Sequence, residues 1–342
     1  MTRPRLILLL LVLGGIALIL APIDLTSYGI PYPGLRRYGT YILTLWMVTA
    51  VAAMGVNLIL GYAGQETLAQ AAFLGIGAYM TALTTKAGLP FGLAFLLSGA
   101  VTFLVGIVLG FPALRVQKHY LAFVTLAFAV LAWLVFRNEQ WLTGGVMGVS
   151  DIRRPSLLGI PLRHHVSFYW FVLGITAALT FVFWWIIRSP WGRAFTALRE
   201  NPIRAESLGI DVRLYTLLAF AIGCAYGGFA GSLYAPLVEF IDPNPFALGQ
   251  SFLYLLMVVI GGAGSFAGPF IGAAIAVLLP EWLRFAESYY LLIYATAVMV
   301  LMAVCPGGIV GLLVRLFAIR SRTPAATQAA DPVGASRSEA AL

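Results

Sequence analysis

The amino-acid sequence predicts an all-α protein, a polytopic transmembrane helical bundle with about ten spans. Of its 342 residues, 61% are hydrophobic and only 10% are charged, whereas a soluble domain carries about 25% charged residues. The apolar residues gather in charge-free runs, and a helix needs about 20 apolar residues to cross a bilayer. The alternating pattern of a membrane β-barrel is absent from the sequence. The runs are 6–23, 38–65, 67–85, 87–114, 120–136, 166–187, 214–238, 243–280 and 288–314.

The first run, 6–23, follows Arg3 and Arg5 and is long enough to span. A secretory signal peptide also has a basic start, but its cleavage site needs small residues. Pro22 and Ile23 do not form such a site. We therefore expect an uncleaved first span.

The run 243–280 is too long for one span. It contains the sequence Gly-Gly-Ala-Gly at 261–264, and clustered glycines favour a turn. Splitting the run at this point gives ten spans. If the run 67–85 only dips into the membrane, the total falls to eight or nine.

The orientation follows from the basic residues, because cytoplasmic loops of membrane proteins carry an excess of Lys and Arg. Most of the 21 Lys and Arg residues fall on one side when both termini are cytoplasmic. The net charge of +8 suits contact with anionic membrane lipid and requires no nucleic acid. We expect one transmembrane domain, 1–319, and a disordered cytoplasmic tail, 320–342.

The loop 189–213 predicts two short amphipathic helices on the cytoplasmic side. Ser189 and Pro190 form a helix start, and an apolar stripe follows at helical spacing. A second short helix begins after Asn201-Pro202. Such a pair either only joins two spans or docks into a groove on a soluble partner. The stripe consists of Trp191, Ala194, Phe195 and Leu198; Gly209 closes the second helix, and Asp211 caps the next span.

Two glycine-rich breaks with polar residues, 57–79 and 261–272, are candidates for a substrate pathway. Transporters bind their cargo at broken helices of this kind, although glycines also serve close helix packing. Glu66 is expected in a solvated cytoplasmic turn. The candidate pathway residues are Asn57, Gln65, Gln70, Tyr79, Tyr120, Thr125, Gly262 and Gly264.

Motifs for enzymatic chemistry are missing from the sequence. Neither Lys86 nor Lys118 lies in a Gly-Lys-Ser/Thr sequence, so the chain has no P-loop for ATP. The zinc motif HExxH and the nucleophile motif GxSxG are also absent. We expect a protein that is not an enzyme, with no catalytic residue, and His164 and His165 as an exposed loop pair without a metal.

Four sequence blocks, in the same order along the chain, resemble permease subunits of ABC importers for branched-chain amino acids, of the M-subunit type. Together they cover most of the region 41–310. The chain departs from this family at 66–69, where relatives usually carry a Leu-Ser-Leu-Gly-like stretch. The blocks are NLILGYAGQETLAQAAFLGIGAYM (57–80), ALRVQKHYLAFVTLAFA (113–129), SPWGRAFTALRENPIRAESLGIDV (189–212) and VIGGAGSFAGPFIGA (259–273).

The resemblance implies import of leucine, isoleucine and valine across the bacterial inner membrane. It implies a second permease subunit as heterodimer partner, two ATPase subunits that use ATP and Mg, and a periplasmic binding protein, with no cofactor in this chain. Urea or short amides remain alternative cargoes, and an ion-coupled secondary transporter remains the alternative from another class. The residues that the resemblance assigns to ATPase coupling are Arg199, Glu200, Ala205, Glu206 and Gly209.

Overall fold

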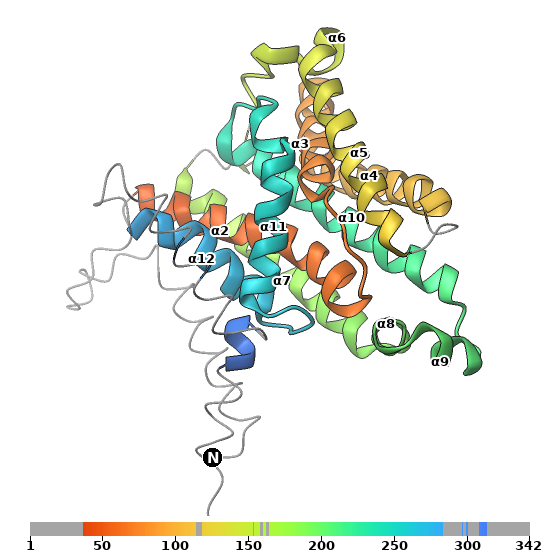
Figure 1. Cartoon of the computed structure of the whole chain (residues 1–342). Coiled ribbons are helices and arrows are strands. Elements are labelled where there is room, and N and C mark those ends of the chain that lie inside the picture. The colour runs from red at the N-terminus through yellow and green to blue at the C-terminus, as the bar shows by residue number, and fades with distance from the viewer. Residues whose placement is uncertain are drawn as a thin grey trace, which may run out of the picture.

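The computed structural model describes residues 37–113, 118–152, 154–157, 160–161, 164–282, 296, 299 and 308–312. Within this part the chain is mostly helical (Figure 1), and β1 (Ser156–Leu157) and β2 (Ile160–Pro161) form a two-stranded hairpin. The predicted span 6–23 and the tail 320–342 lie outside the described residues, as does most of 288–314. Five described helices are long and apolar enough to cross a membrane: Arg37–Tyr62, Phe91–Pro112, Leu121–Asn138, His165–Arg188 and Val212–Val238.

Helix α10 (Val212–Val238) is the centre of the bundle, and it packs against α2 (Arg37–Val56), α3 (Gln70–Lys86) and α4 (Phe91–Ala113). Small residues allow this close approach. A Cβ added at Gly228 would lie 2.1 Å from the Thr102 hydroxyl of α4. Glycine at this position therefore brings α10 into direct contact with its neighbour, as expected for helices packed in a membrane.

The remaining long helices surround this centre. The last turn of α2 widens into a π-helix, η2 (Asn57–Tyr62), and α7 (His165–Arg188) packs along α2. Helix α5 (Lys118–Asn138) contacts α3 and α4 and leads into α6 (Gln140–Thr143) and the short turn η3 (Gly145–Met147).

The predicted break in the run 243–280 is confirmed. After the short turn η4 (Asn244–Phe246), helix α11 (Leu248–Gly261) ends at the first glycine of the break, and α12 (Gly268–Trp282) begins beyond it. At 1.5 Å per residue these helices are about 21 and 23 Å long, shorter than a hydrocarbon core of about 30 Å. The 17-residue α3 is also short, so the total of ten spans stays a prediction.

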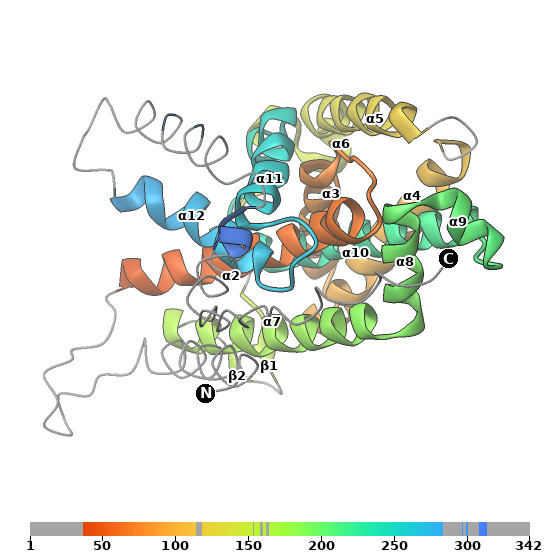
Figure 2. The ribbon, with the colours of Figure 1, turned by 60° about the horizontal axis from the view of Figure 1, so that its bottom comes forward.

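The loops sort into two groups at opposite ends of the bundle. At one end, α8 (Pro190–Glu200) and α9 (Pro202–Ser207) lie beyond the ends of α7 and α10, as Figure 2 shows. At the other end, Val149 pairs with Ile241, and Arg154 forms a 2.7 Å ion pair with Glu239. Each contact joins the loop before α7 to the segment that follows α10.

Candidate functional site

Side-chain caps start each helix of the loop 189–213. The Ser189 hydroxyl accepts a hydrogen bond from the Trp191 backbone N–H at 3.1 Å, and the Asn201 side chain accepts one from the Arg204 N–H at 3.1 Å. Proline is the first residue of both α8 and α9. Asp211 caps α10 in the same way. The predicted helix pair and its three boundaries are thus confirmed.

One face of α8 anchors this helix pair to the bundle. Ala194, Phe195 and Leu198 are buried, and Phe195 packs edge-on against Tyr215 of α10. The fourth residue of the predicted stripe, Trp191, is 41% exposed, because it lies at the first turn of α8, where the helix leaves the bundle. The other three residues of the stripe are buried against the bundle, as the apolar pattern predicted.

Helix α9 presents apolar side chains away from the protein. Ile203 is 76% exposed and Leu208 is 80% exposed, which is unusual for branched apolar residues outside the membrane spans. Glu200, Glu206 and Gly209 are exposed beside them, whereas Ala205 is buried and faces the bundle. Ile203 and Leu208 are therefore both open to contact with a soluble partner.

The Arg199 guanidinium is directed toward the bundle, at Gly61 and Gly264. Its Nη1 donates a hydrogen bond to the carbonyl oxygen of Gly61, the penultimate residue of η2. The side chain crosses the backbone of Gly64, and its Nη1 lies against Gly264, where an added Cβ would be only 2.2 Å away. A cation at a helix C-terminus is favoured by the helix dipole. Arg199 therefore connects α8 to the end of the α2–η2 helix and to the turn between α11 and α12.

Asn57, a predicted pathway residue, links the same two segments. Its Nδ2 donates to the Ser265 carbonyl at 2.9 Å, and its Oδ1 accepts from the Gly264 backbone N–H at 2.8 Å. Gly262 and Gly264 form the turn with φ angles of 116° and 81°. These three predicted residues are therefore brought together, beside Arg199, at the end of the bundle that carries α8.

The other predicted pathway residues are dispersed through the bundle. Gln65 bonds to Thr216 of α10 at 3.0 Å, Gln70 bonds to Ala52 of α2 at 2.9 Å, and Thr125 accepts from the Leu68 N–H at 3.2 Å. Tyr79 packs between aromatic rings, with its hydroxyl buried and unpaired among the described residues. Tyr120 lies in α5, and its side chain is outside the description. These roles as pathway residues stay predictions.

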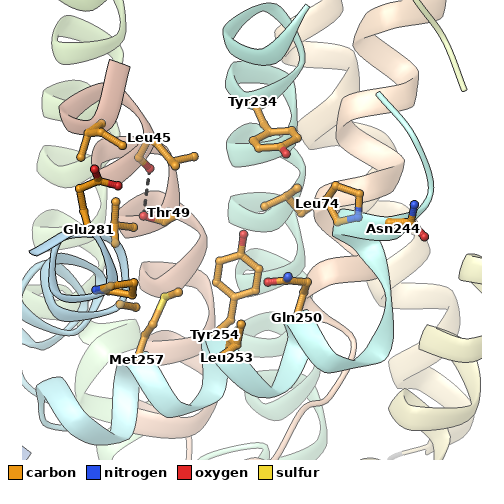
Figure 3. A pocket seen from close by; sticks show the side chains of 15 residues that line it. Leu45, Thr49, Leu74, Tyr234, Asn244, Gln250, Leu253, Tyr254, Met257 and Glu281 are labelled. Carbon is orange, nitrogen blue, oxygen red and sulfur yellow. Dashed lines mark hydrogen bonds between the residues drawn. The ribbon is translucent and has the colours of Figure 1, made fainter. Parts of the chain in front are cut away.

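A cavity of about 770 Å³ opens between α2, α3, α10, α11 and α12, at the end of the bundle opposite α8 (Figure 3). None of the eight predicted pathway residues lines it. Apolar side chains form most of its wall, and the polar groups are few. The lining residues are Ile42, Leu45, Thr49, Leu74, Tyr234, Asn244, Pro245, Gln250, Leu253, Tyr254, Met257, Ala276, Val277, Pro280 and Glu281.

Reasoning from the sequence missed two groups of residues. Ile203 and Leu208 carried a signal, since each is a large apolar residue within a charged loop. The polar residues of the cavity, Tyr234, Gln250 and Tyr254, lie in apolar runs, where polar groups are costly and often functional. Their grouping arises only because α10 and α11 both pack against α2 and α3.

A bundle that contains five apolar helices long enough to cross a membrane indicates a multi-pass membrane protein. The family model described as branched-chain amino acid transport system / permease component matches residues 39–320. The chain belongs to this family.

Individual relatives support the assignment. The chain is 31% identical over 312 residues to the high-affinity branched-chain amino acid transport system permease protein LivM of Escherichia coli (strain K12), covering 84% of this chain and 73% of that protein. It is 32% identical over 292 residues to LivM of Salmonella typhimurium, covering 78% and 69%. The autoinducer 2 import system permease protein LsrC of Salmonella paratyphi B is 25% identical over 202 residues, covering 53% and 56%. No solved structure matches.

Proposed function

We propose that this protein is the translocation subunit of an ATP-driven importer that carries branched-chain amino acids across the bacterial inner membrane. The observation that carries the proposal is the α8–α9 helix pair, which combines a buried face toward the bundle with the exposed apolar side chains of Ile203 and Leu208. Such an element can receive movement from a soluble partner and pass it to the membrane helices. The family supplies the substrate class.

The partner at the helix pair is an ATPase subunit. Ile203 and Leu208 are the contacts that enter its groove, and Glu200 and Glu206 surround them at the rim. Helices with exposed apolar anchors bind in this way to grooves on soluble proteins. ATP and Mg belong to two such subunits, and this chain itself carries no cofactor.

The complete importer contains a second permease subunit and a periplasmic binding protein. In this proposal α8 and α9 face the cytoplasm, together with both chain termini, and the cavity of Figure 3 faces the periplasm. The binding protein delivers the amino acid to the cavity side. The ATPases drive alternating access from the other side. The domain boundaries at 1–319 and 320–342 remain part of this proposal.

The first experiment is uptake of labelled leucine and labelled urea, each at micromolar concentration, in host cells with and without the gene. We expect loss of leucine uptake alone. Loss of urea uptake alone would keep the architecture and change the cargo. If a proton uncoupler stops leucine uptake while ATP is maintained, transport is coupled to an ion gradient. This result would overturn the proposal.

A further inference from the structure

Three polar groups that line the cavity of Figure 3 have no hydrogen-bond partner among the residues that the structure describes. The hydroxyls of Tyr234 and Tyr254 and the side-chain amide of Gln250 line the cavity, and none of them makes a hydrogen bond to another described residue. The Tyr254 hydroxyl points toward Tyr234, and the Gln250 amide lies beside it. Polar groups in an apolar setting are normally paired, so these three are available to a bound molecule or to water.

Other polar groups of the cavity are already used. The Thr49 hydroxyl bonds back to the Leu45 carbonyl of its own helix at 3.0 Å, and the Asn244 amide donates to Asp242 at 2.6 Å. The unpaired groups therefore lie on one wall, formed by α10 and α11.

The opposite wall is apolar with one charge at its edge. Leu45 and Val277 face the cavity from α2 and α12. Glu281 lies at the end of α12, where its carboxylate accepts a 2.7 Å hydrogen bond from the Tyr38 hydroxyl. No Lys or Arg occurs among the residues that line the cavity. The Glu281 carboxylate is thus a group of the lining toward which a ligand's ammonium group can be oriented.

We propose that this cavity is a transit site for an aliphatic α-amino acid. The aliphatic side chain packs on the leucine, methionine and valine side chains of the wall. The carboxylate of the ligand accepts hydrogen bonds from the tyrosine hydroxyls and the Gln250 amide, and its ammonium group lies toward Glu281. Pockets of roughly 300–1,000 Å³ with an apolar lining and a few polar groups are typical ligand sites.

The absence of a cation from the lining suits transit. A buried arginine would hold the carboxylate through strong, charge-assisted bonds and would slow release. Neutral donors give weaker binding, which a site for passage requires. Urea has neither an ammonium group nor an apolar side chain, so the same wall disfavours it. This inference rests on the proposed function.

The test uses the complete importer in proteoliposomes, with the binding protein outside and ATP inside, and measures labelled leucine taken up per ATP hydrolysed. Leu253→Trp fills the cavity, and we expect the ratio to fall at least tenfold while ATPase activity stimulated by the binding protein is retained. Phe252→Trp is the matched control, because Phe252 is its neighbour on α11, is 44% exposed and does not line the cavity. It should keep both values.

A second pair of variants preserves the shape of the protein. Tyr254→Phe removes one hydroxyl from the cavity, and loss of one hydrogen bond to the ligand carboxylate corresponds to about a ten- to hundredfold fall in the ratio. Tyr226→Phe is its control, because the Tyr226 hydroxyl bonds to the Leu179 carbonyl of α7 and does not line the cavity. The control should leave the ratio unchanged.

Three results would overturn the assignment. If Leu253→Trp and Tyr254→Phe both transport leucine at the normal ratio, the cavity is not on the path. If Leu253→Trp no longer co-purifies with the second permease subunit, the cavity is a subunit interface. If the unaltered importer does not take up leucine, the proposed function fails, and the assignment fails with it.

Discussion

Arg199 joins parts of the protein that are far apart in the sequence. Its guanidinium reaches the Gly61 carbonyl, 138 residues away, and lies against Gly264. The charged group thus turns toward the membrane helices and not toward a docked partner. Within the proposed importer, Arg199 is a positioning residue that carries movement of α8 to η2 and to the α11–α12 turn.

Replacing Arg199 should therefore uncouple transport without unfolding the protein. Arg199→Glu removes the donor and places a carboxylate against a carbonyl oxygen, so we expect leucine uptake to be abolished while the ATPases still bind. The stability cost should be about 1 kcal/mol, at the lower end for charged hydrogen bonds because the side chain is exposed. Uptake and co-purification of the ATPases are the two measurements.

Arg199→Lys is the matched control, since lysine keeps the charge and can still donate to Gly61. It should retain part of the uptake. If Arg199→Glu released the ATPases, Arg199 would be a docking contact, and its link to Gly61 would be incidental. Normal uptake by Arg199→Glu would exclude any role in coupling.

At the level of the element, α8 and α9 have different roles: α8 anchors the pair to the bundle, and α9 is open to a partner. Helix α8 is held to the bundle by Phe195 and its buried neighbours, whereas α9 exposes Ile203 and Leu208. The proline at the start of each helix fixes the change of direction between them. The helix pair is anchored to the bundle through α8 and offers apolar contacts to a partner through α9. It can therefore transmit movement between the partner and the membrane helices.

Ile203→Glu should break docking. Burying an unpaired carboxylate in an apolar groove is strongly unfavourable, so we expect at least a tenfold loss of ATPase co-purification and a parallel loss of leucine uptake. Ser207→Glu is the control, because Ser207 is also exposed on α9 and is already polar. It should have a much smaller effect.

Deletion of 202–209 should abolish uptake for the same reason and leave the protein in the membrane. If the ATPases still bind both the deletion variant and the Ile203→Glu variant, their binding surface lies elsewhere on the chain.

At the level of the whole molecule, the loops at the two ends of the bundle should lie on opposite sides of the membrane. Ser207→Cys and Met147→Cys place a thiol at each end, and both positions are exposed. A membrane-impermeant maleimide should label Met147→Cys in cells with an opened outer membrane. It should label Ser207→Cys only after the inner membrane is permeabilised.

The unaltered protein, with Cys224 and Cys305, gives the background for this experiment. The reverse labelling pattern would show that the bundle is inverted, and would contradict cytoplasmic docking at α9. Labelling of both positions from outside would contradict the assignment of the two loops to different sides.

The sequence by itself determined the features that depend on local pattern. Apolar runs indicated the membrane helices, Gly261–Gly264 indicated the break between α11 and α12, and Ser189-Pro190 and Asn201-Pro202 indicated the two helices of the loop. Each of these follows from residues close together along the chain, because hydrogen bonds within a helix and at its caps join near neighbours. The four sequence blocks also indicated the family.

Only the tertiary structure decided which residues share a site. Asn57 was expected to line a pathway, but its amide bonds to Gly264 and Ser265, about 207 residues further on. The three cavity groups that have no partner among the described residues come from α10 and α11, which both pack against α2 and α3. Sequence patterns report burial and periodicity, whereas contacts between distant segments depend on how complementary helix surfaces fit together.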